Sequence, residues 1–371
     1  MADWFEPGYK AGGPIRSVVN FANNFSNDLE IFVLTTDRDL GDTQAYNGIT
    51  ADQWISYNEN VQVFYASPQW LSWSAIKNAV RKINPDIIYL NSMYSKFYSL
   101  YPLLMKRAGM IPGRIILAPR GMLKQSAVEF KQGKKKIFLK LFRTLGLQRN
   151  VHFHCTDATE QADVKKYFGE VRSTVLANSP GTQKKFQPPP YKTAGSAKLI
   201  FIGRMHPIKN LHYLLELLKD VKQNISLTVI AGLEDRAYNE ECQNLAKRLP
   251  AHVSVDFKGE LAHHELEAPL QQHHLFVLPT KGENFGHAIF EALSAGRPAL
   301  ISDQTPWRKL EDHKAGWDVS LDQPQQFAAA IEKVAAMDNE TMNEWCRGAW
   351  NFCNNYLKNS DIRAAYLKLF S

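Results

Sequence analysis

Cysteine is scarce in this sequence of 371 residues: it has only four, and no two of them form a CxxC pair. Such spacing argues against a zinc knuckle or a thiol redox motif, so reduced thiols are expected. No stretch approaches the ~20 apolar residues that a membrane-spanning helix needs. The opening MADWFEPGYK also lacks the apolar core of a secretion signal, which favours a cytoplasmic location.

Acidic residues are nearly absent between residues 101 and 150, where twelve lysines or arginines accompany one acid, Glu129. The local charge of +11 exceeds the +7 of the whole chain, so the remainder carries −4. Such a basic block suggests an anionic partner, which is a phosphate ligand, a nucleic acid or the headgroups of a membrane.

Within this block, the run from Lys134 to Arg143 mixes cations with large apolar residues at spacings that suit a helix. A basic amphipathic helix can lie on an anionic membrane, which would place the protein at the inner face of the cytoplasmic membrane. The run also suits a domain helix that buries its apolar face and leaves its lysines in water. Both interpretations stay open.

Short apolar runs alternate with helical patterns along the whole chain, which indicates parallel sheets with helices on both faces, the α/β class. The length accommodates two domains. Only residues 2–5 precede the first glycine loop, so the first strand is expected to be short or missing. Strands are expected at 30–35, 61–65, 86–90, 114–118, 152–155, 174–177, 199–202, 227–231, 253–257, 275–278 and 298–301. The main helices are expected at 70–83, 94–108, 157–168, 211–221, 238–249, 324–336 and 340–357.

Three consecutive prolines, Pro188 to Pro190, interrupt this alternation, because neither a helix nor a central strand continues through them. The sequence therefore predicts an N-terminal domain over residues 1–186, a linker over 187–197 and a C-terminal domain over 198–357. A last helix within 358–371 has an apolar face suited to packing back on the N-terminal domain.

Residues 275–302 read as strand, loop, helix and strand. In an open parallel sheet such a loop lies at the carboxyl end of a strand, where ligands bind, and the helix start offers backbone N–H groups to an anion. Glu283 is in the loop and Glu291 about one turn inside the helix, a separation suited to holding two parts of one ligand. Gly286 permits close approach of that ligand. Alternatively, Glu283 is a solvated acid and Glu291 complements the helix dipole.

Two cations, Arg204 and Lys209, flank a turn at the carboxyl end of the strand 199–202, at the same sheet edge as Glu283. Together they can neutralise a nucleotide diphosphate without a metal, so no metal or other cofactor is expected. A basic strand end with a solvated helix start is the alternative interpretation.

Near the N-terminus, Gly12 and Gly13 precede Pro14 at a predicted helix start. A glycine turn that leads into a helix can hold a phosphate, and a simple tight turn explains the same pattern. His152 and His154 share one face of a predicted strand among apolar neighbours, and a structural pair is favoured there over a metal site.

The segments GRMHPIKN (203–210) and GENFGHAIFEAL (282–293) resemble the sugar-nucleotide-dependent retaining glycosyltransferases of family four. Those enzymes have a GRxxxxK turn and an E-x7-E signature in their C-terminal half. The segments AGGPIRSV and LAPRGML are also similar to that family, and the resemblance covers nearly the whole chain. It implies the GT-B fold, in which two Rossmann-like doubly wound domains face each other across a cleft, with the acceptor on the N-terminal side.

Carried over position by position, the resemblance assigns Arg204 and Lys209 to the donor diphosphate and Glu283 to the hydroxyls of the transferred sugar. Glu291 would bind the ribose. The family often has histidine where this chain has Arg120, which shifts the expected role of this catalytic position toward holding an anion. Further donor contacts are implied for Gly12 and Gly13 and for the backbone of Asn284, Phe285, Gly286 and His287.

The implied reaction moves a hexose from a nucleotide sugar, such as a UDP- or GDP-sugar, to a saccharide or a polyprenyl-diphosphate-linked glycan, with retention of configuration, in cell-surface polysaccharide biosynthesis. A sugar-nucleotide epimerase shares the two-domain fold and is one alternative. The other is a nucleic-acid-binding protein that uses the basic block, but it leaves Glu283 and Glu291 unexplained, so no nucleic acid is expected as a partner.

Overall fold

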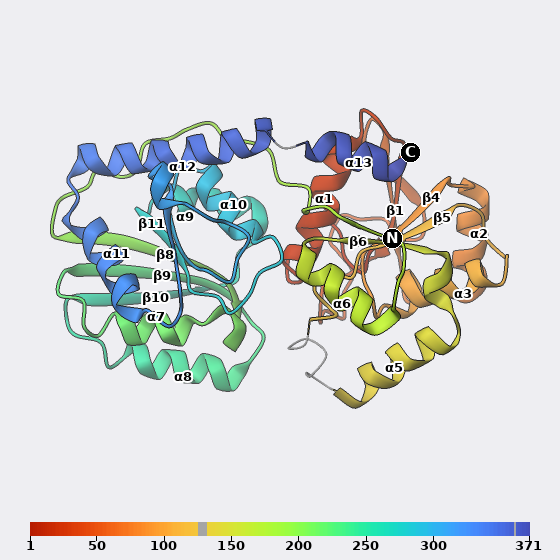
Figure 1. Ribbon diagram of the computed structural model, residues 1–371, viewed down its shortest axis with the longest axis horizontal. Helices are drawn as coiled ribbons and strands as arrows, with labels where there is room; N and C mark the ends of the chain where they lie inside the picture. The colour runs from red at the N-terminus through yellow and green to blue at the C-terminus, as the bar shows by residue number, and fades with distance from the viewer. Residues whose placement is uncertain (125–131, 360) are drawn as a thin grey trace. The chain divides into compact units, whose positions relative to one another are not determined.

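The computed structural model describes residues 1–124, 132–359 and 361–371, so Glu129 and the side chain of Lys134 lie outside the described part. The chain divides into two compact units (Figure 1). The first comprises Met1–Ser179 and Asp361–Ser371, and the second comprises Pro180–Ser360. No helix in the described ranges is both long and apolar enough to cross a membrane.

The second unit is built on a six-stranded sheet in which every neighbouring pair is parallel, in the order β10-β9-β8-β11-β12-β13. All four residues of β11 and of β12 are buried, because helices cover both faces of the sheet there. The strands are β8 (Ser196–Met205), β9 (Asn224–Leu233), β10 (Val253–Gly259), β11 (Leu275–Leu278), β12 (Ala299–Ser302) and β13 (Gly316–Val319).

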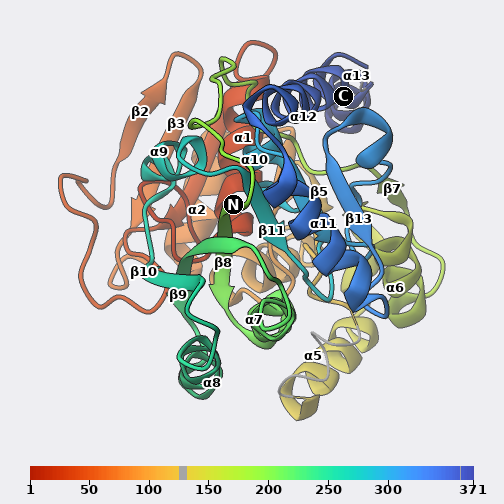
Figure 2. The same cartoon turned by 90° about the vertical axis from the view of Figure 1, so that its left-hand side faces the viewer.

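Helices sandwich this sheet. The helices are α7 (Leu211–Leu217), α8 (Arg236–Ala246), α9 (Glu267–Gln271), α10 (His287–Ser294), α11 (Pro324–Ala336) and α12 (Asn339–Asn359). Contacts join α7 to α8 and to α11, and join α10 to α12. Figure 2 shows α7 and α8 on the opposite side of the sheet from α12. This doubly wound arrangement directs the loops after β8 and β11 to one edge of the sheet.

The first unit contains two smaller sheets. In one, β1 pairs with β3 in parallel and β2 adds an antiparallel edge; in the other, four parallel strands follow chain order. The strands are β1 (Ile31–Thr36), β2 (Trp54–Asn58), β3 (Val61–Ala66), β4 (Ile87–Leu90), β5 (Arg114–Leu117), β6 (Val151–Cys155) and β7 (Ser173–Val175). The α-helices are α1 (Gly13–Phe25), α2 (Trp73–Ile83), α3 (Tyr101–Arg107), α5 (Gln132–Thr144), α6 (Ala158–Phe168) and α13 (Ile362–Phe370).

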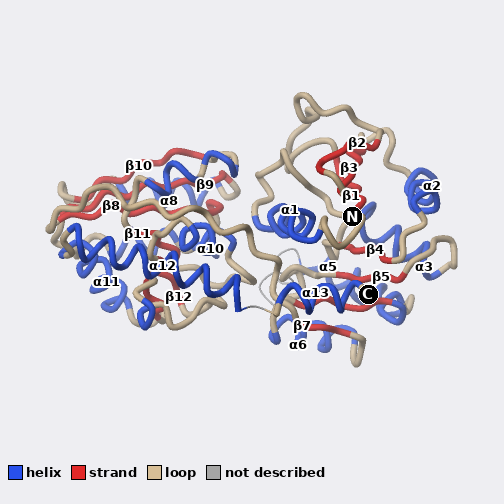
Figure 3. Tube along the Cα trace, turned by 90° about the horizontal axis from the view of Figure 1, so that it is seen from above, coloured by secondary structure: helices blue, strands red, loops and turns tan. Residues whose placement is uncertain are grey.

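Residues 1–3 join the two sheets of the first unit. The N–H of Ala2 donates to the carbonyl of Leu34 in β1 at 3.1 Å, and the N–H of Asn91, next to β4, donates to the carbonyl of Met1 at 3.1 Å. Figure 3 shows the N-terminus between β1 and β4. The position where a short or missing first strand is expected therefore holds a segment that is not a strand but hydrogen-bonds to the residues of both sheets.

The chain changes units at residue 180 rather than at 187. The segment 184–192 packs on the rest of the second unit. The N–H of Lys184 donates to Ser294 Oγ at 3.1 Å, and the carbonyl of Lys184 accepts from Trp350 Nε1 at 2.7 Å. Arg297, which is fully buried, donates to the carbonyls of Gln187 and Pro188. The segment expected to be a linker is thus fixed to the second unit.

The last helix, α13, belongs to the first unit. Tyr366 is buried against Phe25, with ring centroids 4.9 Å apart, and its hydroxyl donates to the carbonyl of Ala177 at 3.1 Å. The apolar face seen in the sequence is used for this packing.

Candidate active site

The structure brings Lys209 and Glu283 together at the carboxyl ends of β8 and β11. Lys209 Nζ forms an ion pair with Glu283 Oε1, and the two side chains are only 16% and 12% exposed. The lysine stem lies over Gly203, where an added Cβ would meet Lys209 Cγ at 3.5 Å. Because water is largely excluded, this attraction is screened less than that of a surface pair.

The loop that carries Glu283 is held on two sides. The N–H of Lys281 donates to the carbonyl of Ile208 at 2.7 Å, and Thr280 Oγ1 donates to the same carbonyl at 3.0 Å. On the other side, the N–H of Glu283 donates to the carbonyl of Gln304 at 3.1 Å. These bonds tie the loop both to the turn before Lys209 and to the segment after β12, so the carboxylate is presented from a fixed backbone.

Gly286 precedes the first residue of α10 and has a left-handed backbone that favours glycine. Its φ is 78°, and an added Cβ would lie 2.8 Å from Ile289 Cδ1. Gly286, as the N-cap residue, has no side chain to cap this helix start, and Trp307 Nε1 fixes the preceding turn by donating to the carbonyl of Phe285 at 2.6 Å. Backbone amides of the segment from Asn284 to His287 therefore lead into the positive end of a helix, which suits an anionic ligand.

Glu291 has a partner that the sequence does not reveal. His263 Nε2 lies 2.8 Å from Glu291 Oε1, and both side chains are partly buried. The two residues are 28 positions apart, and His263 lies in a short 3-10 turn after β10. No local pattern in the sequence links these two residues.

Arg204 lies at the end of β8 but pairs with a different acid. Its Nη1 is 2.8 Å from Glu234 Oε2, with side chains 46% and 41% exposed. Glu234 follows β9, the strand that runs beside β8. A pair this exposed is worth at most about 1 kcal/mol, so a ligand phosphate can displace the carboxylate.

Arg120 follows β5 in the first unit and has a left-handed backbone with φ 55°. Its Nη2 donates to Tyr89 Oη at 2.8 Å and to Asn91 Oδ1 at 2.7 Å, and its Nη1 donates to Asn178 Oδ1. These three partners are neutral, so none of them compensates the positive charge of the guanidinium.

The turn that carries Arg120 is held by a buried acid that no pattern in the sequence singles out. Glu160 is fully buried and accepts hydrogen bonds from the N–H of Gly121 and, at 2.7 Å, from the N–H of Thr156. Glu160 thereby ties the turn after β5 to the end of β6.

His154 contacts Tyr89, which is one of the three partners of Arg120. Its Nδ1 is 2.6 Å from Tyr89 Oη, and its Nε2 is 2.8 Å from the carbonyl of Leu176. Since a carbonyl only accepts, Nε2 donates to Leu176 and Nδ1 accepts from Tyr89. Burial lowers the pKa of His154 to about 3, so the ring is neutral and structural.

This pKa predicts how acid affects stability. Between about pH 6.5 and about pH 3 the unfolded chain protonates His154 while the folded chain does not, so the free energy of unfolding decreases as the pH falls. From pH 7 to pH 5 this one group removes about 2 kcal/mol. We expect His154→Gln to unfold in urea with a smaller loss over that interval. Equal losses in both proteins would contradict the assignment.

Gly12 and Gly13 also lie in the first unit. Gly12 has φ 63° and precedes the first residue of α1, Gly13, with no side-chain cap. The loop before them is held by Asp39, whose Oδ2 accepts from the N–H groups of Tyr9 at 2.7 Å and Lys10 at 3.1 Å. The predicted residues are thus divided between the two units, with Arg120, Gly12 and Gly13 in the first and the others in the second.

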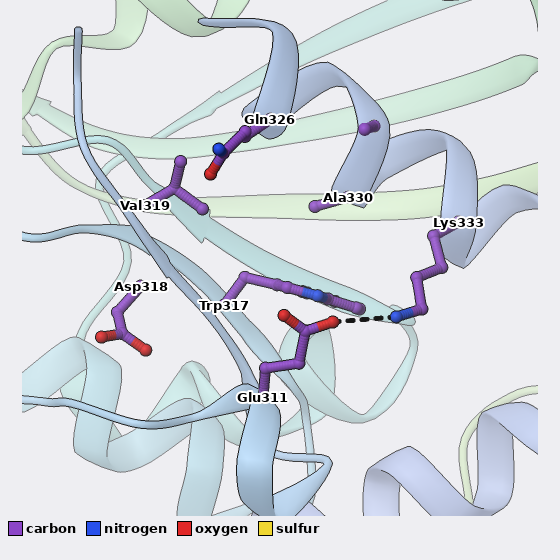
Figure 4. Close-up of a pocket in the computed structure, with 8 residues that line it drawn as sticks. Glu311, Trp317, Asp318, Val319, Gln326, Ala330 and Lys333 are labelled. Carbon is purple, nitrogen blue, oxygen red and sulfur yellow. Dashed lines mark hydrogen bonds and ion pairs between the residues drawn. The ribbon is translucent and has the colours of Figure 1, made fainter. Parts of the chain in front are cut away.

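A separate pocket of about 320 Å³ lies between β13 and α11 in the second unit (Figure 4). Lys333 and Glu311 form an ion pair there at 2.9 Å, and Lys333 Nζ lies 5.5 Å from the centroid of the Trp317 ring. None of the residues predicted for the site lines this pocket, and its cation already has an acidic partner.

Comparison with known proteins identifies the second unit. Residues 183–349 match the family described as "Glycosyl transferases group 1". These residues form a group 1 glycosyl transferase domain. The domain contains the Lys209–Glu283 pair, Glu291 and Arg204, so the resemblance found in the sequence is confirmed at the level of the family.

Two relatives align over parts of the chain. Phosphatidyl-myo-inositol mannosyltransferase of Mycobacterium tuberculosis is 29% identical over 153 residues, which are 39% of this chain and 39% of that protein. The O-antigen chain mannosyltransferase RfbU of Salmonella typhimurium is 21% identical over 231 residues, or 58% of this chain and 64% of its own. The chain therefore matches less than two thirds of either relative.

Solved structures resemble the chain over nearly its whole length. Sucrose-phosphate synthase from Thermosynechococcus elongatus has a TM-score of 0.68 at 15% identity and covers 100% of this chain and 96% of its own. HepE of Anabaena, solved with UDP and glucose, has a TM-score of 0.64 at 15% identity and covers 96% and 95%. These structures cover both units of the chain, so the chain has the GT-B fold that the sequence predicted.

Proposed function

We propose that this protein is a retaining glycosyltransferase that moves a hexose from a nucleotide diphosphate sugar to a saccharide or a lipid-linked glycan in cell-surface polysaccharide biosynthesis. The observation that carries the proposal is the shielded Lys209–Glu283 pair, whose carboxylate lies in the loop that leads to the start of α10 inside a group 1 domain. It places a cation suited to a phosphate beside a carboxylate suited to sugar hydroxyls.

The proposed chemistry follows from how charge develops. As the bond between the anomeric carbon and the phosphate oxygen breaks, positive charge grows on the sugar and negative charge on the departing diphosphate. Lys209, Arg204 and the start of α10 stabilise that negative charge, which lowers the barrier without a metal. The acceptor oxygen bonds to the anomeric carbon from the same face, and its proton passes to the leaving phosphate oxygen.

On the acceptor side, Arg120 is proposed to hold an anionic group. Its guanidinium is oriented by three neutral partners, and the turn beneath it is fixed by Glu160. An acceptor linked to a polyprenyl diphosphate supplies such a group, and its phosphates match the fork of an arginine.

The donor class is supported by relatives. HepE was solved with UDP and glucose, and one of the similar structures is a UDP-forming trehalose-phosphate synthase. A UDP- or GDP-sugar at about one hundred times its Kd is expected to add roughly 2.7 kcal/mol to the free energy of unfolding, measured as a rise in Tm. If no sugar nucleotide in a panel raises the Tm, the donor site is wrong.

The reaction itself is tested by following the nucleotide. With a stabilising donor and an acceptor extract, a transferase releases free nucleoside diphosphate only when acceptor is present. An epimerase instead converts the sugar while it stays attached to the nucleotide. The proposal fails if the sugar is isomerised without release of diphosphate.

A further inference from the structure

Helix α5 displays an apolar stripe on its outside. Ile137, Leu141 and Leu145 are 62%, 54% and 49% exposed, and their spacing of four residues places them on one side of the helix. The N–H of Leu145 donates to the carbonyl of Leu141 at 2.8 Å, so the helical path reaches Leu145. Few large apolar side chains are this exposed in the described residues, and here three adjoin one another.

The opposite side of α5 already fulfils the role of a domain helix. Leu139 and Phe142 are buried in the core of the first unit, and the Phe142 ring lies 5.0 Å from that of Phe168. One interpretation of the sequence, a domain helix that buries its apolar face and leaves its lysines in water, therefore explains this side of α5. The second apolar stripe is not needed for this packing.

A row of cations runs beside the exposed stripe. Lys136, Lys140 and Arg143 are exposed at spacings of four and three residues, which places them together on the helix. At the end of the stripe, Arg107 is also exposed, and its Nε donates to the carbonyl of Leu145 at 3.2 Å. The described ranges 101–124 and 132–150 contain no aspartate or glutamate.

We propose that this face of α5 docks the protein on an anionic lipid surface. Ile137, Leu141 and Leu145 enter the boundary between headgroups and acyl chains, and the adjacent cations contact lipid phosphates. In Figure 1, α5 runs along the outside of the first unit, beyond α3 and α6. The docking is independent of the transferase reaction and goes beyond it.

The combination of side chains selects lipid over the other anionic partners. A single-stranded nucleic acid offers phosphates, but it binds through stacking on aromatic side chains, whereas the stripe is aliphatic. A soluble phosphate ligand would leave the three aliphatic side chains in water. Of these three anionic partners, a membrane surface is the one that offers an apolar phase directly beside a layer of negative charge.

Flotation of the full-length protein with vesicles tests the proposal. We expect binding to vesicles of phosphatidylcholine mixed with phosphatidylglycerol and none to phosphatidylcholine alone. Each lysine or arginine near such a surface contributes about fivefold in affinity, so replacing Lys136, Lys140 and Arg143 by glutamine weakens binding by about a hundredfold. The matched control removes the same charge from exposed sites of the second unit, Lys222→Gln, Lys247→Gln and Arg248→Gln, and retains binding.

The apolar stripe is tested by replacing Ile137, Leu141 and Leu145 with serine. Because charge alone binds weakly, this variant is expected to stop floating while keeping the Tm of the parent protein. In a separate Leu141→Trp variant, anionic vesicles should shift the tryptophan emission to the blue. Flotation unchanged by the serines, or a weakening equal in the control variant, overturns the proposal. So does a concentration-dependent dimer that the serines abolish, because a second copy would then be the occupant.

Discussion

Lys209→Ala is expected to lower turnover on the order of a hundredfold or more, because it removes one fixed electrostatic stabiliser of the departing diphosphate. The structure adds a second reason. Lys209 is paired with Glu283 where both side chains are shielded, so the substitution deprives that carboxylate of this cation. The remaining negative charge repels the donor phosphates, and the Kd for free nucleoside diphosphate should rise as well.

Lys281→Ala is the matched control for this experiment. Lys281 lies in the same loop, two residues before Glu283, but its side chain is exposed and its backbone makes the loop contact. This variant should keep nearly the parental rate and Kd. A Lys209→Ala protein with an unchanged Tm and a near-parental rate would remove Lys209 from the mechanism.

The parts of the fold that the sequence predicts well are those with a local physical signal. The buried run 275–278 matches β11 residue for residue, because a strand covered on both faces needs continuous apolar side chains. The helix 324–336 also coincides with α11, since a proline marks its first turn. Lys209 and Glu283 lie just after two such strands, β8 and β11, within the sequence motifs that follow them, so their positions are predictable from the sequence.

Other elements lack a local signal. β2 (Trp54–Asn58) is a half-exposed antiparallel edge with serine and asparagine in it, and β13 (Gly316–Val319) begins with a glycine with φ 136° and contains an aspartate. Neither resembles a buried strand in isolation, because pairing with β3 and β12 is what stabilises them. Strand formation there depends on tertiary contacts.

The same limit applies to the candidate site. Glu234 reaches Arg204 because β9 runs beside β8, and His263 reaches Glu291 from a separate turn. Glu160 supports Arg120 from α6, a different element again. Each of these partners is separated by 28 to 39 positions from the residue it contacts, and no spacing rule for a helix or strand covers such a distance.

Glu283→Ala is expected to reduce turnover by on the order of a hundredfold or more, for a different reason from Lys209→Ala. In the proposed complex its carboxylate binds hydroxyls of the transferred sugar and so positions the anomeric carbon. Free nucleoside diphosphate has no such hydroxyls. The Kd for UDP or GDP should therefore not rise in this variant, while turnover of the sugar nucleotide collapses.

Measuring both quantities in both variants separates the two roles. A lysine that serves the phosphate raises the Kd for the free nucleotide, and a glutamate that serves the sugar does not. Glu344→Ala is the control, because Glu344 pairs with Lys314 at 2.6 Å with both side chains more than half exposed, and a pair of that kind contributes little. If Glu283→Ala weakened free nucleotide binding as much as Lys209→Ala, the carboxylate would be acting only by orienting the lysine, and its assignment to the sugar would be wrong.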